Sequence, residues 1–357
     1  MTAEDLRAAV AAGIVDEAQA AKLRVLVEAR AGHRQAMPSE DEPFEFFRGF
    51  SEIFISIGLV ILLTGVTMML AWFGGFGLLV AVPLITAGIA WWWAGYFTLR
   101  RRMTLPSMVL ATAFGVGLAI FAVTVLEQMD VGARMAGVLA FALPSAGMVL
   151  WYRRFRLPFA AFLTGGFVLG AIYAFTASTA NLTGMMSGAS GFDGLFDLRE
   201  SPAFATATLV FGIGAFLVGM WFDTRDPHRL GRHAATAFWC HLLAAPALVN
   251  TVAVTLLNSG GGQGIGMLSL ALVVITILAL VIDRRSFLTA AIVYIAVVIS
   301  WFAGDAQDFG SWIFILIALG ALITGIGTWW VQLRAFVMKV LPNFPGKDRL
   351  PPYARPE

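Results

Sequence analysis

Long apolar runs that end in tryptophan and then in arginine recur along this sequence, and they constrain its fold more than any other feature. Pro83–Arg102 reads PLITAGIAWWWAGYFTLRRR, and the same order returns in Ala142–Arg154, Phe211–Arg225 and Ala318–Arg334. About 20 apolar residues are enough to cross the hydrocarbon core of a bilayer as a helix. Indole rings favour the lipid–water boundary, and arginines beyond them can meet lipid phosphates. The pattern therefore predicts a chain that crosses a membrane several times.

Composition agrees with this prediction, because only 13% of the 357 residues are charged and 59% are hydrophobic. A soluble protein carries about 25% charged residues. Backbone groups in lipid must find internal hydrogen-bond partners, and these runs lack the period-2 alternation of barrel strands. We therefore expect an all-α polytopic membrane bundle of about ten transmembrane helices. The ten stretches are Ser51–Trp72, Phe76–Phe97, Pro106–Leu126, Ala133–Trp151, Leu157–Ser178, Pro202–Phe222, Ala234–Leu257, Ile265–Ile282, Phe287–Phe302 and Ser311–Val331.

The distribution of positive charge predicts the orientation of the chain. With ten spans both termini lie on one side, and the segments on that side hold 22 of the 24 Lys and Arg residues. The opposite side holds only Arg134 and Arg199. Lys and Arg concentrate in the loops on the cytoplasmic side of membrane proteins. We therefore expect both termini in the cytoplasm.

The residues before the first apolar run predict a small cytoplasmic domain. Residues 1–31 are expected to form a helical hairpin, in which Gly13 ends the first helix and Asp16 with Gln19 forms a capping box for the second. Residues 32–49 are expected to be a linker and interfacial segment, 50–333 the transmembrane bundle and 334–357 a cytoplasmic tail. The residues expected to meet across the hairpin are Leu6, Val10 and Ile14 on one helix and Ala21, Val25 and Leu26 on the other.

The tryptophans at the ends of the apolar runs can be interpreted in two ways. They could form an aromatic cage for a cation. They could instead anchor the helix ends at the membrane interface, which is the reading we prefer because all of them fall on the side predicted to be cytoplasmic. The expected interface anchors are Trp91, Trp92, Trp93, Trp151, Trp221, Trp329 and Trp330.

Three polar residues are candidates for substrate binding. His241 is the one ionisable residue well inside a predicted span, and titratable groups in that position often serve function. The alternative is a neutral imidazole that hydrogen-bonds to a neighbouring helix. Glu127 ends the third span, where a carboxylate could bind a cation or simply lie at the headgroups. Asn250 lies nine residues after His241, so it turns to the opposite face of the helix and should not join it in one site.

Several kinds of chemistry are disfavoured. The sequence contains no HExxH, GxSxG, Walker A or Rossmann glycine pattern, and its single cysteine, Cys240, excludes a multi-cysteine metal site within one chain. We therefore expect no catalytic residues, no metal, no cofactor and no nucleic-acid partner. The expected partners are the lipid bilayer and a protein that binds the hairpin.

The first 30 residues resemble those of a bacterial family. Leu6, Ala9-Val10, Gly13-Ile14-Val15, Glu17-Ala18-Gln19-Ala20 and Leu23 are similar to the N-terminal hairpin of predicted integral-membrane proteins known only by a domain of unknown function. That resemblance implies a bacterial inner membrane and supplies no catalytic residues. Two hypotheses follow. The first is a non-enzymatic membrane protein that docks or organises a partner through its hairpin. The second is a secondary transporter or lipid-handling protein with a site near His241.

Overall fold

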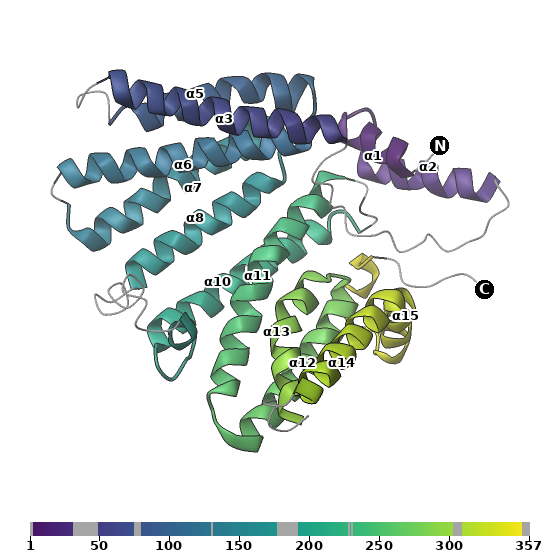
Figure 1. Cartoon of the computed structure of the whole chain (residues 1–357). Helices are drawn as coiled ribbons and strands as arrows, with labels where there is room; N and C mark the ends of the chain where they lie inside the picture. Colours follow the sequence, from purple (N-terminus) through teal and green to yellow (C-terminus); the bar gives the residue numbers. More distant parts are fainter. Residues whose placement is uncertain are drawn as a thin grey trace. The chain divides into compact units, whose positions relative to one another are not determined.

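The computed structural model describes residues 3–30, 49–74, 80–129, 131–176, 192–227, 229, 231–302 and 309–351. Every regular element in these ranges is a helix (Figure 1). The chain divides into two compact units. We call Phe44–Ser187 the first membrane unit, and Gly188–Glu357 together with Met1–Pro43 the second membrane unit. The expected all-α membrane architecture is confirmed, but the residues expected to form one bundle belong to two units.

Among its described residues, the first membrane unit contains four long helices and one shorter helix. The long helices are α3 (Phe50–Phe73), α6 (Thr104–Gln128), α7 (Ala133–Phe155) and α8 (Phe159–Thr176). The shorter α5 (Val82–Ala94) continues directly as a π-helix, η1 (Gly95–Arg100). Small residues on α5 and α6 are fully buried where these helices pack, which allows their backbones to approach closely.

Aromatic rings fill the interior of the first membrane unit at the end where η1 and α7 finish. The Trp151 indole is fully buried, and its centroid lies 5.5 Å from that of Trp91 and 5.0 Å from that of Phe114. Phe155 completes the cluster, 4.6 Å from Trp151. A membrane-interface anchor needs an exposed ring, which Trp151 lacks. Its ring instead packs between helices, where buried aromatic contacts stabilise the fold.

A carboxylate from α3 joins two helices at the same end of this unit. Glu52 is buried, and its Oε2 atom accepts hydrogen bonds from the backbone N–H groups of Thr104 and Leu105, both at 3.1 Å. The first N–H groups of a helix have no partner inside the helix, and a negative charge there also interacts favourably with the helix dipole. Glu52 therefore caps α6 from a residue 52 positions earlier in the chain.

The second membrane unit is organised around α11 (Arg232–Leu257), the helix with the largest buried share of its length. It packs closely with α10 (Pro202–Asp223) and α13 (Ser286–Phe302). The described residues after α11 add α12 (Gly261–Ile282), α14 (Phe309–Thr328) and α15 (Trp330–Val340) to this unit, which also has short 3-10 turns at Phe192–Leu195 and Lys347–Arg349 and includes the N-terminal hairpin. Figure 1 shows α12 to α15 grouped together, with α10 and α11 beside them.

The number of spans is lower than the ten that the sequence predicts. Among the described residues seven helices are long and apolar enough to cross a membrane, or eight if the bent pair α14 and α15 is counted as one span. This bend is 71°. The α5 helix has only 13 residues before η1 begins, and α13 has 17. Residues 76–79 of the second expected stretch lie outside the described part. Hydropathy counts apolar residues and does not register where a helix changes type or bends.

The hairpin forms from α1 (Ala3–Ala11) and α2 (Glu17–Arg30), as the sequence predicts. The capping box is confirmed, because the Gln19 N–H donates to Asp16 Oδ1 at 2.7 Å and the Asp16 N–H donates to Gln19 Oε1 at 3.0 Å. Its small core differs from the expected one. Leu6 and Ala20 are buried with Val10, Val15 and Ala21 against them, whereas Ile14, Val25 and Leu26 are exposed. The expected linker lies largely outside the described residues, and α15 crosses the boundary expected at residue 333.

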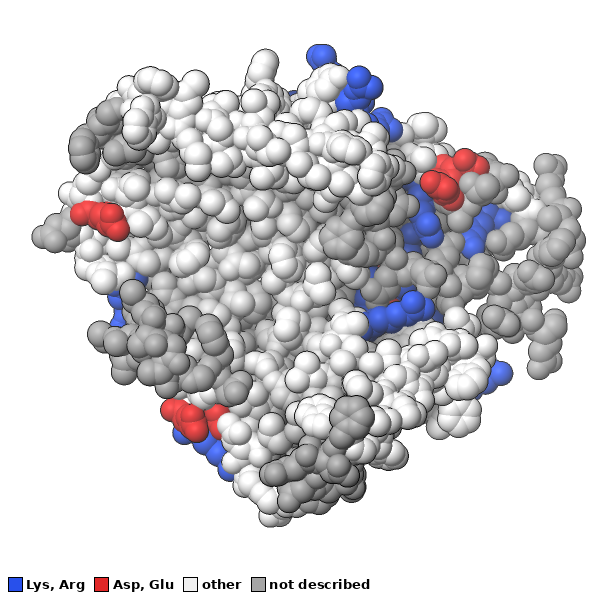
Figure 2. All heavy atoms as spheres, in the orientation of Figure 1, with Lys and Arg blue, Asp and Glu red and all other residues white. Residues whose placement is uncertain are grey.

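The outer flanks of the helices are apolar. Figure 2 shows broad white surfaces along them, with charged residues gathered near helix ends. Large hydrophobic side chains such as Val210, Leu270 and Leu316 are more than half exposed on these flanks. An exposed apolar surface of this extent needs lipid around it. The protein is therefore embedded in a membrane.

Candidate functional site

His241 is completely buried in α11, nine residues after the helix begins. Its ring fits against the backbone of α10 at Gly219, where an added Cβ would lie 2.8 Å from the imidazole. The Phe216 ring from α10 and the Phe287 ring from α13 meet the imidazole edge-on, with centroids 5.5 and 6.0 Å away. Because Gly219 has no side chain, the imidazole can reach across α10 to the polar groups at the end of that helix.

The imidazole shares one carboxylate with an arginine. His241 Nε2 lies 2.9 Å from Asp223 Oδ2, and Asp223 is the last residue of α10. Arg284 donates from Nε to the same oxygen at 3.2 Å and from Nη2 to Asp223 Oδ1. Arg284 also donates to the Ala234 carbonyl at 3.1 Å. Since a carboxylate bound to arginine acts only as an acceptor, Nε2 of His241 carries the hydrogen of the shared bond. Nδ1 of His241 is buried without a hydrogen-bond partner among the described residues.

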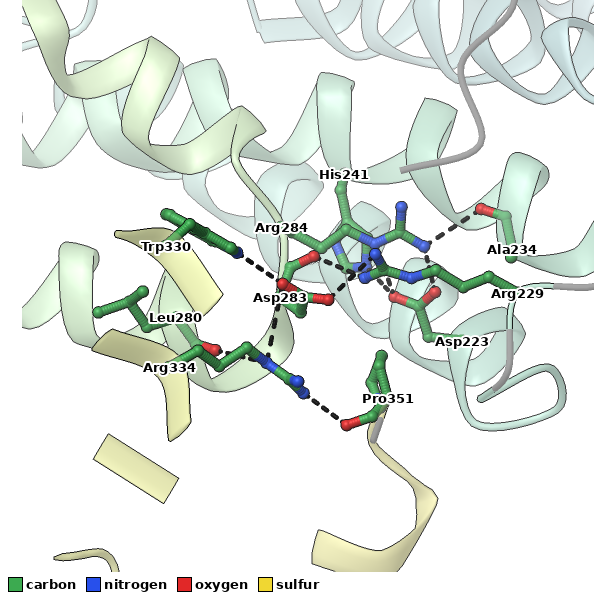
Figure 3. Close-up of polar contacts among 10 residues, drawn as sticks. All are labelled: Asp223, Arg229, Ala234, His241, Leu280, Asp283, Arg284, Trp330, Arg334 and Pro351. Carbon is green, nitrogen blue, oxygen red and sulfur yellow. Dashed lines mark hydrogen bonds and ion pairs between the residues drawn. The ribbon is translucent and has the colours of Figure 1, made fainter. Parts of the chain in front are cut away.

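A second carboxylate, Asp283, lies next to Arg284 in the chain and gathers its own partners (Figure 3). Arg229 donates to the Asp283 carbonyl at 2.6 Å and forms an ion pair with its carboxylate at 3.1 Å. The Trp330 indole donates to Asp283 Oδ1 at 2.7 Å, and Arg334 Nε lies 3.7 Å from that oxygen. We refer to Asp223, Arg229, His241, Asp283, Arg284 and Arg334 as the charge network.

The turns between helices place these side chains. Arg229 and Asp283 both adopt positive φ angles, 53° and 57°, in the turns that follow α10 and α12. Asp226 accepts hydrogen bonds from the backbone N–H groups of Gly231 and Ala234, so it caps the start of α11. Residues other than glycine are strained in the left-handed region. Ion pairs and capping bonds hold this strained geometry in place.

Burial makes the charge network sensitive to change. Each of its six members has a relative exposure of 4% or less. Taking ions out of water costs free energy that their attraction repays only when the geometry is good, and apolar side chains of similar volume often stabilise a protein equally well. Stability alone therefore gives no reason to bury two aspartates, three arginines and a histidine. Buried ionisable groups within spans commonly serve proton or substrate pathways.

The end of the chain covers one side of the charge network. Arg334 donates to the Leu280 carbonyl at 3.1 Å and to the Pro351 carbonyl at 2.6 Å. Lys347 donates to the carbonyls of Met338 and Leu341 at the end of α15, at 2.8 and 2.9 Å. These bonds satisfy carbonyl groups that have no partner within the helix. Residues 341–351 are therefore held against the network by buried cations.

The bend between α14 and α15 adjoins the charge network. Trp330 is the first residue of α15 and is 2% exposed, with its indole bound to Asp283. Trp330 therefore does not present its ring to the membrane interface, in contrast to the expectation for this residue. The neighbouring Trp329 is 60% exposed and remains available to lipid.

The other two candidate residues do not join His241. Asn250 Oδ1 accepts a hydrogen bond from the Tyr294 hydroxyl on α13, so it links two helices. Glu127 is exposed at the end of α6, in the first membrane unit. Of the remaining tryptophans, Trp92 is 76% and Trp221 49% exposed, as interface anchors require, whereas Trp91 and Trp93 pack against the core of the first membrane unit.

Sequence reasoning missed the partners of His241. Asp223, Asp283 and Arg284 stand where apolar runs end, and hydropathy assigns such residues to loops. The sequence did contain one signal. Asp223 directly follows the apolar residue Phe222, and Asp283 with Arg284 directly follows Ile282. In the fold these helix ends lie beside the middle of α11. His241 is there, 18 residues after Asp223 in the sequence. Proximity of this kind depends on helix packing and cannot be read from local spacing.

The hairpin contacts the turn before α11. A Cβ added to Gly231 would overlap the Glu17 carboxylate, which begins α2. Burial raises the pKa of the Glu17 carboxyl to about 7, and the Asp226 carboxylate adds to this rise while Arg232 opposes it. Asp16 adds a smaller repulsion in the same direction. A carboxyl group in this position changes its charge near neutral pH, at the turn that also supplies Arg229.

The chemistry open to this site is proton exchange and ion pairing. Among the described residues no group of three or more His, Cys, Asp and Glu side chains could hold a metal ion. The imidazole, by contrast, has a hydrogen bond on one nitrogen and a free position on the other. Comparisons with protein-family models, curated proteins and solved structures found no match to this chain.

Proposed function

We propose that this protein is a secondary transporter or lipid-handling protein of a bacterial inner membrane, without enzymatic activity, in which His241 exchanges a proton. The observation that carries the proposal is the 2.9 Å contact between His241, fully buried in a span, and the Asp223 carboxylate that Arg284 also binds. The predicted orientation, with both termini in the cytoplasm, sets the charge network at the cytoplasmic ends of α10 and α12.

A proton on His241 would alter how three elements are held together. Asp223 belongs to α10, His241 to α11 and Arg284 to the turn between α12 and α13. A positive imidazolium would compete with the Arg284 guanidinium for one carboxylate, since His241 Nε2 and Arg284 Nε both bind the Oδ2 atom of Asp223. Histidine is the side chain that most often serves as a proton switch in proteins, because it can be neutral or positively charged. Weakening one of the two ion pairs would loosen α10 from α11 or from the turn between α12 and α13.

The test uses the accessibility of a single cysteine. Cys240, the only native cysteine, is first replaced by alanine, and Ala244→Cys then places a thiol one helical turn beyond His241, at a buried position. We expect a membrane-impermeant maleimide to label this thiol from one side of sealed vesicles at a rate that changes with pH. Adding His241→Gln should abolish the pH dependence, because glutamine hydrogen-bonds but does not titrate.

Two matched cysteines control for reagent chemistry. Ala18→Cys lies on the exposed face of the hairpin and reports how the reaction itself varies with pH. Ala111→Cys is fully buried in the first membrane unit and should stay unlabelled. If the thiol at position 244 never reacts from either side at any pH, a proton-linked opening near His241 is refuted.

A second candidate function is partner docking through the hairpin. Ile14 is 76%, Val25 55% and Leu26 51% exposed on α1–α2, outside the membrane-spanning helices. Apolar side chains exposed together often mark a binding surface. Deletion of residues 1–43 should then remove a co-purifying protein while the remaining chain stays in the membrane. An unchanged co-purification profile would exclude this function and leave the transport proposal intact.

A further inference from the structure

Two turns of the first membrane unit carry six exposed arginines. Arg100 ends η1 and is followed by Arg101 and Arg102, while Arg153 and Arg154 lie in the last turn of α7 and Arg156 follows it. The two turns belong to one end of the unit, because α7 contacts η1. In Figure 2 blue side chains stand at the right-hand end of the uppermost helices, while the flanks of these helices are white. We call residues 100–102 and 153–156 the arginine turns.

The protein supplies little to neutralise these charges. Arg101 donates to the Tyr96 hydroxyl at 2.9 Å, and Arg154 lies over the Phe155 ring. None of the six arginines forms an ion pair with a described residue. Glu52, whose partners follow Arg102 in the chain, is buried and its Oε2 atom already caps α6. As far as the described residues go, the arginine turns therefore carry positive charge without a carboxylate partner, and the start of α6 is not available as an additional anion site.

Backbone geometry indicates that the side chains at these turns matter. Arg102 has a φ of 52° and Arg156 a φ of 55°, in the left-handed region where glycine is favoured. The only other described residues with positive φ, glycines aside, are Arg229 and Asp283, and both form ion pairs of the charge network. Charged residues in strained backbone conformations often lie at functional sites. Within the described part of the chain, no ion pair is formed by Arg102 or Arg156.

An apolar surface adjoins the arginine turns. Trp92 is 76% and Tyr96 42% exposed, one helical turn apart on the segment that leads to Arg100. The change from α5 to the π-helix η1 lies between these two residues, before the chain reaches the arginines. Short π-helical segments occur often at functional sites. A ligand with an anionic head and apolar tails matches charge at the turns and aromatic rings beside them.

We propose that the two arginine turns form a binding site for the phosphate of an anionic phospholipid, with its acyl chains along Trp92 and Tyr96. Guanidinium groups bind phosphate oxygens in bidentate geometry, which makes arginine well suited to this head group. The site belongs to the first membrane unit and does not depend on proton exchange at His241, so failure of one proposal leaves the other standing.

The experiment compares lipids on the purified full-length protein. Wild type is reconstituted in phosphatidylcholine nanodiscs with and without one-fifth phosphatidylglycerol, and bound lipid is counted by native mass spectrometry after extraction. We expect retained phosphatidylglycerol and a higher thermal unfolding temperature in its presence. The double variant Arg102→Gly, Arg156→Gly should bind phosphatidylglycerol roughly tenfold more weakly, since each basic residue near a lipid head group contributes measurable affinity. Glycine relieves the backbone strain, so this variant should fold.

Control variants separate charge from backbone effects. Arg102→Lys with Arg156→Lys keeps the charge and should retain most of the binding, while Arg102→Asn with Arg156→Asn removes the charge with a residue that tolerates positive φ and should lose it. Arg134→Gln, at the opposite end of α7, should bind like wild type. Equal phosphatidylglycerol binding by wild type and both neutral double variants would overturn the proposal. So would inorganic phosphate giving the same stabilisation in phosphatidylcholine alone, because the ligand would then be free phosphate.

Discussion

Removing Arg284 provides the sharpest test of how the charge network stabilises the fold. Arg284 is fully buried, with two bonds to the Asp223 carboxylate and one to the Ala234 carbonyl. Arg284→Met keeps the volume and leaves the Asp223 carboxylate buried with His241 as its remaining partner. Removing one member of a buried ion pair costs about 3–5 kcal/mol of unfolding free energy. Asp223→Asn leaves an uncompensated guanidinium and should cost a similar amount.

The double variant distinguishes an ion pair from two independent sites. With both charges removed, the loss should be smaller than the sum of the two single losses by at least about 2 kcal/mol, because neither variant residue leaves a buried charge unpaired. The free energies can be measured by steric trapping of the protein in bicelles. Arg285→Met is the matched control, since Arg285 is the next residue, is exposed and lies 5.5 Å from the Trp330 ring centroid. This change should cost about 1 kcal/mol or less.

The refuting results are specific. A cost below about 1 kcal/mol for Arg284→Met would mean that water or lipid head groups reach Asp223, so that the network is not buried in the way described. Single losses that add within about 0.5 kcal/mol would mean that Arg284 and Asp223 do not interact energetically. Either result would also remove the physical basis for a proton at His241 acting through their shared carboxylate.

Three further outcomes are expected. Because docking raises the Glu17 pKa from 4.5 to about 7, the docked hairpin binds a proton more tightly and is most stable below pH 4.5. Its stability should fall as pH rises through 7, by about 1 kcal/mol after solvent screening, seen as faster hydrogen exchange in residues 3–30 that Glu17→Gln abolishes. Gly219→Ala places a methyl group 2.8 Å from the buried imidazole and should destabilise by about 1–3 kcal/mol in thermal unfolding, whereas Gly214→Ala, with open space around it, should not. Glu52→Gln weakens the cap of α6 and should cost about 1–2 kcal/mol by the same assay, against about 0.5 kcal/mol or less for Glu127→Gln at an exposed position.

Local patterns predicted the hairpin and its capping box because both depend on residues close in sequence. Asp16 and Gln19 are three positions apart, and their reciprocal bonds need only one turn of helix. The hairpin core was predicted less well. Val25 and Leu26 fit an apolar pattern but are exposed, whereas Ala20 is fully buried. Which face of a short helix turns inward depends on its partner as well as on its own sequence.

Apolar length and charge distribution were enough to predict an all-helical membrane protein, because a bilayer leaves the backbone few alternatives. They were not enough to predict the number of spans, since hydropathy does not detect the π-helical end of α5 or the bend before Trp330. Nor could they find the partners of His241. Asp223, Arg284 and Asp283 lie at helix ends separated by up to 61 residues, and only the packing of those ends around α11 buries them together. Sequence by itself thus determined that His241 lies inside a membrane helix, whereas tertiary structure decided that it shares a carboxylate with an arginine, because ion pairs form between atoms that are close in space.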